Sequence, residues 1–166
     1  MNKLVVLSGV PGSGKSYFAR TIKKLRNAHT YVISSDELRA LIGGSQSNLE
    51  NERLVWKIFY GLAKVYAQDD RGIVVLDATN VTSKLRVDYN KDLSLLFDEV
   101  DLVLWNIPRD IVSNQNLQRE YPIPPEALDH FLEIFEMPNE KDKAFFNKII
   151  VIEKADIAPA IKMLEL

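Results

Sequence analysis

The feature of this sequence that most constrains its fold is a glycine-rich segment between an apolar run and a helical pattern. Residues 9–16 read G-V-P-G-S-G-K-S and follow the apolar run Leu4–Leu7 after a single serine, Ser8. They match the phosphate-loop pattern G-x-x-x-x-G-K-S, in which glycines let backbone N–H groups converge on a polyphosphate at the positive end of a helix. The pattern therefore predicts an α/β fold with a nucleoside triphosphate site. The predicted nucleotide-binding residues are Gly9, Val10, Pro11, Gly12, Ser13, Gly14, Lys15 and Ser16.

The last residues of this loop distinguish it from a dinucleotide-binding turn. Lys15 supplies a positive charge for the phosphates, and Ser16 supplies a hydroxyl for Mg²⁺ that bridges them. A dinucleotide fold would also explain an acidic residue about 20 positions further on, which Asp36 fits. That fold needs a third glycine where this chain has Tyr17, so the sequence favours the triphosphate, ATP or another nucleoside triphosphate.

Short apolar runs alternate with helical patterns along the chain. Because the runs are continuously apolar rather than alternating, they are typical of parallel strands covered on both faces. We expect a three-layer α/β sandwich with a five-stranded parallel sheet, helices on both faces and a helical lid. The predicted strands are Lys3–Ser8, Tyr31–Ser34, Gly72–Asp77, Asp101–Asn106 and Lys148–Glu153. The predicted helices are Tyr17–Leu25, Asn48–Gln68, Ser83–Phe97, Ile111–Arg119, Pro125–Phe135 and Ile157–Leu166, with a proline-rich hinge at Glu120–Pro125.

Composition limits the other classes of function. The 166 residues, 46% of them hydrophobic, are expected to form one domain over residues 1–166. The chain has no cysteine and only two histidines, which excludes disulfide frameworks and thiolate metal sites. A net charge of −2 argues against a broad electrostatic surface for nucleic acid, although a local basic patch is compatible with it. No apolar stretch approaches the ~20 residues of a membrane span, and we expect a cytoplasmic protein without membrane contact.

Polar residues follow the second predicted strand, where parallel strands direct their carboxyl ends at one crevice. Asp36 stands where a carboxylate could accept the proton of a hydroxyl acceptor. Its alternative role is to complement a helix dipole, because Ser34 and Glu37 form a capping-box pattern. Arg39, three residues on, is a candidate substrate contact or a surface partner of Asp36.

The third predicted strand ends in a second polar group. Asp77 closes four apolar residues, as a metal-binding carboxylate does in nucleotide-binding proteins, so Ser16 and Asp77 are the predicted Mg²⁺ residues. Thr79 and Asn80 are candidates for substrate binding, or they cap the next helix. Arg86 lies one turn into that helix and binds phosphate if it faces inward.

Arg119 lies just before the proline-rich hinge. It either complements the end of a helix or acts as a lid arginine that stabilises the charge on a transferring phosphoryl group. We therefore include it with Asp36 and Lys15 as a candidate catalytic residue.

These motifs together resemble the polynucleotide 5′-hydroxyl kinase family. The resemblance rests on residues 9–16, Ser-Ser-Asp-Glu-Leu-Arg at 34–39, Asp-Ala-Thr-Asn-Val at 77–81 and the tail 115–138. It implies a P-loop kinase that transfers the γ-phosphoryl group of ATP, with Mg²⁺, to a 5′-OH end of RNA or DNA. By the same resemblance Asp36 is the general base, Arg39 holds the acceptor phosphate and the lid spans approximately residues 109–136.

Two departures from the family pattern bear on this expectation. Gln115 stands where related lids often carry an arginine, which removes one phosphate contact. The chain also has no Asp-x-Asp phosphatase motif, so we expect a stand-alone kinase. Two alternatives stay open: a kinase for a small-molecule hydroxyl on a nucleoside, sugar or antibiotic, and a non-enzymatic nucleotide switch, against which Asp36 and Arg39 argue.

Overall fold

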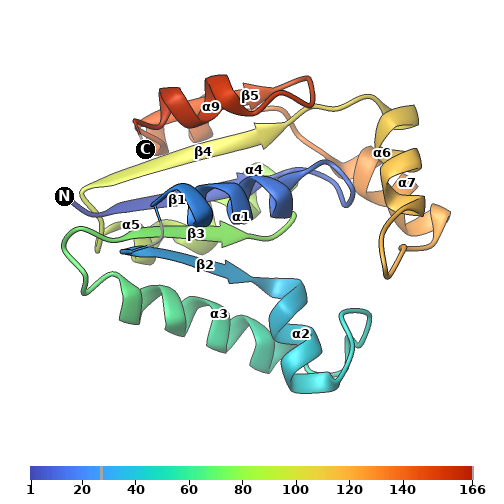
Figure 1. Ribbon diagram of the computed structural model, residues 1–166, viewed down its shortest axis with the longest axis horizontal. Helices are drawn as coiled ribbons and strands as arrows, with labels where there is room; N and C mark the ends of the chain where they lie inside the picture. Colours follow the sequence, from blue (N-terminus) through green and yellow to red (C-terminus); the bar gives the residue numbers. More distant parts are fainter. Residues whose placement is uncertain (27, 166) are drawn as a thin grey trace.

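A parallel β-sheet forms the centre of the computed structural model, which describes residues 1–26 and 28–165. Its five strands follow the order β2-β3-β1-β4-β5, and every neighbouring pair is parallel (Figure 1). The strands are β1 (Lys3–Ser8), β2 (Thr30–Ser34), β3 (Ile73–Asp77), β4 (Glu99–Trp105) and β5 (Lys148–Ile152). They correspond closely to the predicted apolar runs, and the predicted fold class is confirmed.

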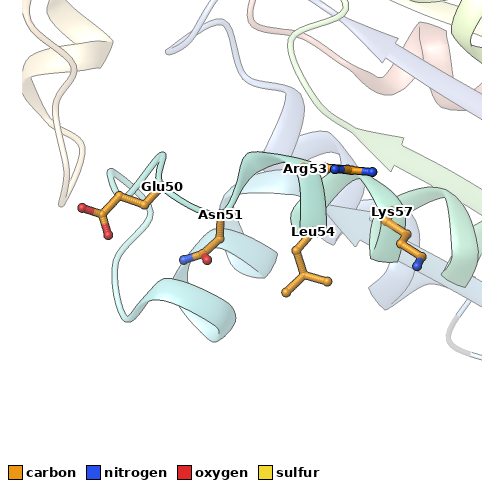
Figure 2. Close-up of a pocket in the computed structure, with 5 residues that line it drawn as sticks. All are labelled: Glu50, Asn51, Arg53, Leu54 and Lys57. Atoms are coloured by element: carbon orange, nitrogen blue, oxygen red, sulfur yellow. The ribbon is translucent and has the colours of Figure 1, made fainter.

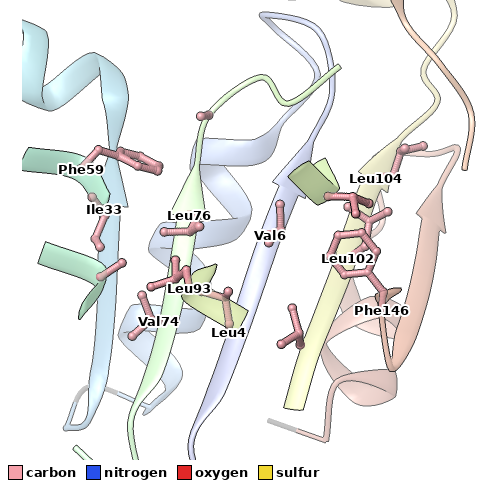
Figure 3. Close-up of a cluster of buried hydrophobic side chains, with 14 of the residues drawn as sticks. Leu4, Val6, Ile33, Phe59, Val74, Leu76, Leu93, Leu102, Leu104 and Phe146 are labelled. Carbon is pink, nitrogen blue, oxygen red and sulfur yellow. The ribbon is translucent and has the colours of Figure 1, made fainter. Parts of the chain in front are cut away.

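Helices cover both faces of the sheet. Along β1, Val5 and Leu7 pack beneath α1 (Lys15–Arg26) and α9 (Ala158–Met163), because successive side chains of a strand point to opposite faces. Leu4 and Val6 belong to the other core, which Figure 3 shows. That face is covered by α3 (Glu52–Tyr66), α4 (Ser83–Val87), α5 (Lys91–Ser94) and α8 (Glu140–Phe145).

The elements around the carboxyl ends of the strands position the candidate site. In Figure 1, α2 (Ser35–Gly43), α6 (Arg109–Leu117) and α7 (Pro125–Ile134) lie at the end toward which the strand arrows point. Ser34 caps α2 by accepting the backbone N–H of Glu37 at 3.3 Å, which is one of the two contacts of the predicted capping box. Gly44 ends α2 in a left-handed conformation with φ +79°, which glycine adopts without steric cost.

Several helix predictions were wrong in extent. The helix expected at residues 83–97 is divided into α4, the 3₁₀ turn η1 (Asp88–Asn90) and α5. The Asn90 side chain donates to the carbonyls of Leu85 and Arg86, so it takes acceptors that a continuing helix would use. The helix expected at 48–68 begins only at Glu52, and α8 was not predicted.

The carboxyl-terminal helix was predicted to reach Leu166, which lies outside the described residues; α9 ends at Met163. No helix in the described part of the chain combines the length and the apolar character needed to cross a bilayer.

Candidate active site

The phosphate loop connects β1 to α1 and is held from both sides. The backbone N–H of Gly9 donates to the carbonyl of Thr79 at 2.8 Å, which ties the loop to the segment after β3. Gly12 has φ +82°, and a Cβ there would lie 2.9 Å from the carbonyl oxygen of Val112 in α6. Gly14 has φ +111°. Glycine is therefore required at Gly12 both by its backbone conformation and by the close approach of the lid.

The Lys15 side chain lies along the inside of this loop. Its ammonium group donates to the carbonyls of Gly9 at 2.8 Å and Val10 at 3.0 Å, and it is 3.4 Å from the Ser13 hydroxyl. Burial lowers the pKa of Lys15 to about 8, although the charges of Asp77 and Asp36 raise it. A buried cation of this kind gains strongly from a nearby phosphate.

Ser16 and Asp77, the predicted Mg²⁺ residues, lie in direct contact. The Ser16 hydroxyl donates to Oδ2 of Asp77 at 2.8 Å. Burial raises the pKa of Asp77, while Lys15 and the Ser16 hydroxyl act in the opposite direction. One hydroxyl and one carboxylate beside a phosphate loop fit Mg²⁺, which takes few protein oxygens and completes its shell with phosphate and water. Within residues 1–26 and 28–165, no cluster of three or more His, Cys, Asp or Glu side chains could hold a metal ion by itself.

Asp36 lies between Arg39, three residues further along α2, and Arg119, which comes from a distant part of the chain. Oδ1 accepts Nη1 of Arg39 at 2.8 Å, and Oδ2 accepts Nη2 of Arg119 at 3.2 Å. The Asp36 side chain is 39% exposed, so a substrate hydroxyl can reach it. Arg119 belongs to the segment after α6 and is 83 residues away in sequence. The structure therefore brings together the carboxylate and the lid arginine that the sequence analysis proposed separately.

Arg39 also binds a residue that the sequence analysis missed. Its Nε and Nη2 donate to the two carboxylate oxygens of Glu52, at 2.5 Å and 3.0 Å. Glu52 opens α3, and no motif in the sequence singled it out. The only available signal was an acidic residue in the first turn of a helix, which is too common to be informative.

Arg86 occupies a different place from the one expected. Its guanidinium is fully buried and pairs with Asp142 of α8, Nε to Oδ1 at 2.7 Å and Nη2 to Oδ2 at 3.1 Å. Nη1 donates to the backbone carbonyl of Glu136 at 2.9 Å. Arg86 does face inward, but it meets a carboxylate and not the nucleotide crevice. The expected substrate contact is contradicted, and Arg86 instead joins α4 to the segment that leaves the lid.

Asn80 and Thr79 also serve the framework of the site. Asn80 is buried with φ +41°, and its amide donates to the Leu7 carbonyl at 2.8 Å. That contact uses an amide donor that was expected to meet substrate. Thr79 is half-buried and holds Gly9 through its backbone carbonyl. Neither residue caps α4, because Thr82 accepts the Leu85 N–H there.

The lid packs against the loop and is internally clamped. Val10 of the phosphate loop shares a buried cluster with Val112 of α6 and Leu128 of α7. The side chain of Asn116 donates to the carbonyl of Ile123 at 2.9 Å and accepts its N–H at 3.1 Å. The proline-rich connection therefore has a defined path between the two lid helices. Gln115, next to Asn116, is exposed.

Comparisons with known proteins agree with this architecture. A family model described as an AAA domain matches residues 4–138. A sugar kinase from Janibacter sp. HTCC2649 has a TM-score of 0.68 at 17% identity, over 99% of this chain and 95% of that one.

Two further solved structures have the same fold. A fungal RNA kinase has a TM-score of 0.66 at 16% identity over 99% of this chain, but only 42% of the RNA kinase is covered. The APS kinase CysC of Mycobacterium tuberculosis, in complex with AMPPNP and APS, has a TM-score of 0.65 at 15% identity, with 99% and 96% covered. At these identities the likeness establishes a P-loop kinase fold and leaves the acceptor open.

Proposed function

Since the chain belongs to the AAA domain family, which matches residues 4–138, we propose that it is an ATP-dependent kinase for the 5′-hydroxyl end of RNA or DNA. The observation that carries this proposal is the position of Asp36. It is an accessible carboxylate, contacted by Arg119 from the lid and Arg39 from α2. It follows the carboxyl end of β2, and Lys15 follows the carboxyl end of the parallel strand β1, so both lie at the same end of the sheet. A nucleotide switch has no use for such a group.

The proposed reaction joins the acceptor oxygen to the γ-phosphorus while the bond from that phosphorus to the β–γ bridging oxygen breaks. The acceptor proton passes to Asp36, and ADP leaves with the electron pair of the broken bond. Lys15 stabilises the β- and γ-phosphates, and Arg119 stabilises charge on the transferring group. Ser16 and Asp77 would hold Mg²⁺, which supplies charge neutralisation between the phosphates. The backbone of residues 9–14 orients the donor.

Support for a polynucleotide acceptor comes from the residue pattern at 34–39 and 77–81, which resembles polynucleotide 5′-kinases. The fold is shared alike with a fungal RNA kinase, a sugar kinase and an APS kinase, so it is compatible with either class of acceptor. A small-molecule hydroxyl is the second candidate acceptor. It is favoured by the net charge of −2 and by the engagement of Arg39 with Glu52, which leaves less of Arg39 for a phosphodiester.

The test is a phosphate-transfer assay with Mg·ATP and a panel of acceptors: 5′-OH RNA and DNA oligonucleotides, nucleosides and sugars. We expect label on the oligonucleotides. Transfer only to nucleosides or sugars would replace the polynucleotide assignment by the second candidate. Tight ATP binding without transfer to any acceptor would refute the kinase assignment and support a switch.

A further inference from the structure

We propose that Glu52 is a positioning residue of the acceptor site, which holds Arg39 in the orientation in which Arg39 contacts Asp36. The proposal deepens the proposed function and rests on it, because it concerns the carboxylate assigned as the base. The pair between Arg39 and Glu52 uses Nε and Nη2 against both carboxylate oxygens. Such a two-point contact fixes the plane of the guanidinium, which a single contact would not.

Glu52 is itself held in place. Its Oε2 accepts the indole N–H of Trp56 at 3.1 Å, one helical turn further along α3. The hydrogen bond from Arg39 keeps the pKa of Glu52 below its ordinary value, so the carboxylate is charged throughout the neutral range. Its position in the first turn of α3 also suits a negative charge, since helix amino-termini are electropositive.

The opposite edge of the guanidinium faces Asp36. Nη1 of Arg39 donates to Oδ1 of Asp36 at 2.8 Å and lies 3.4 Å from the Ser35 hydroxyl. The guanidinium carbon lies 5.7 Å from the centre of the Trp56 ring, and the Arg39 side chain is only 13% exposed. Contacts on both edges and on one face leave Arg39 little freedom.

This arrangement limits what Arg39 can do for an acceptor. The Glu52 carboxylate occupies the Nε edge of the Arg39 guanidinium. A phosphate that approached this edge would be repelled by the negative charge of Glu52. Arg39 therefore acts chiefly by orienting Asp36, in contrast to the phosphate contact that the family resemblance implies. Loss of Glu52 should then impair turnover more than acceptor binding, because a misplaced base slows the chemical step.

The experiment compares Glu52→Gln and Glu52→Ala with wild type in transfer to the acceptor on which wild type is active. We expect kcat to fall by roughly 10- to 100-fold in the alanine variant and less in the glutamine variant, with the KM values for ATP and acceptor little changed. Glutamine keeps one oxygen for Arg39, so it should rescue part of the loss. In an Arg39→Ala background, Glu52→Ala should have no further effect, because Glu52 acts through Arg39.

Glu50→Gln is the matched control. Glu50 is exposed, and Figure 2 shows it directed away from α3, on the hollow that Asn51, Arg53, Leu54 and Lys57 also line. Its side chain makes no hydrogen bond or ion pair within the described residues. This variant removes a neighbouring charge without touching Arg39, so its kinetics should equal those of wild type.

The outcomes distinguish a failure of the positioning role of Glu52 from a failure of the proposed kinase activity. If Glu52→Gln lowers the acceptor KM while kcat is unchanged, Glu52 competes at a phosphate subsite, and the positioning role is refuted. Unchanged kinetics in both Glu52 variants refute it as well. If wild type and the Glu50 control transfer phosphate to no acceptor, the proposed function fails and the positioning role fails with it.

Discussion

The buried pair of Arg86 and Asp142 provides the sharpest quantitative test of the structure. Both side chains are fully buried and joined by two hydrogen bonds. Arg86→Met keeps much of the apolar bulk of the side chain but leaves the Asp142 carboxylate without its cation. A stranded buried charge is far more costly than a lost surface contact, because the interior cannot solvate it.

The expected loss is about 3–5 kcal/mol of the free energy of unfolding, the usual cost of removing one partner of a buried pair. For a chain of this size each kcal/mol lowers the melting temperature by about 2–4 °C, so we expect a fall of roughly 6–20 °C. Adding Asp142→Asn removes the stranded charge and should recover much of the loss.

Thermal unfolding followed by circular dichroism measures these effects. The matched control is Arg109→Met, because Arg109 pairs with Asp129 while their side chains are 66% and 50% exposed. That pair should contribute less than about 1 kcal/mol. If Arg86→Met melts like wild type but loses phosphate transfer, the structural assignment is wrong and the substrate role expected from the sequence is restored.

The remaining predictions concern the candidate site. Asp36→Asn should abolish transfer while calorimetric ATP binding stays near wild type; full activity would place the base elsewhere. Arg119→Ala should lower kcat by about 10³-fold, the low end for arginine fingers, with a smaller change in ATP affinity, and an unchanged kcat would remove its lid role. The pKa of Lys15 is about 8, so its charge is present below that pH and lost above it. ATP affinity should therefore weaken as the pH rises through about 8, a dependence that should be absent in Lys15→Ala. Gly12→Ala should weaken ATP binding, because its Cβ would lie 2.9 Å from a lid carbonyl, whereas Gly44→Ala, with a similar φ of +79° but nothing within 4 Å, should affect stability alone.

Much of the geometry of the phosphate loop could be predicted from the sequence, for a local reason. The glycines at 12 and 14, the lysine and the serine meet requirements that lie within one strand, one loop and one helix. The carboxyl ends of parallel strands also converge whatever the side chains are, which is why Ser16 and Asp77 could be predicted to meet. The structure places their oxygens 2.8 Å apart.

The partners of Asp36, Arg39 and Arg86 depended on tertiary contacts that no local sequence pattern encodes. The sequence left open whether the Arg86 side chain points into the protein or toward solvent. It points inward because Asp142 of α8, a helix that was not predicted, supplies its carboxylate partner. Glu52 meets Arg39 only because α3 begins beside α2. The sequence by itself determined the α/β class and the phosphate loop, since these follow from backbone conformation and hydrophobic pattern over a few residues. Only the tertiary structure decided the partners of Asp36, Arg39 and Arg86, because the direction of a charged side chain is set by whichever distant charge the packing brings within reach.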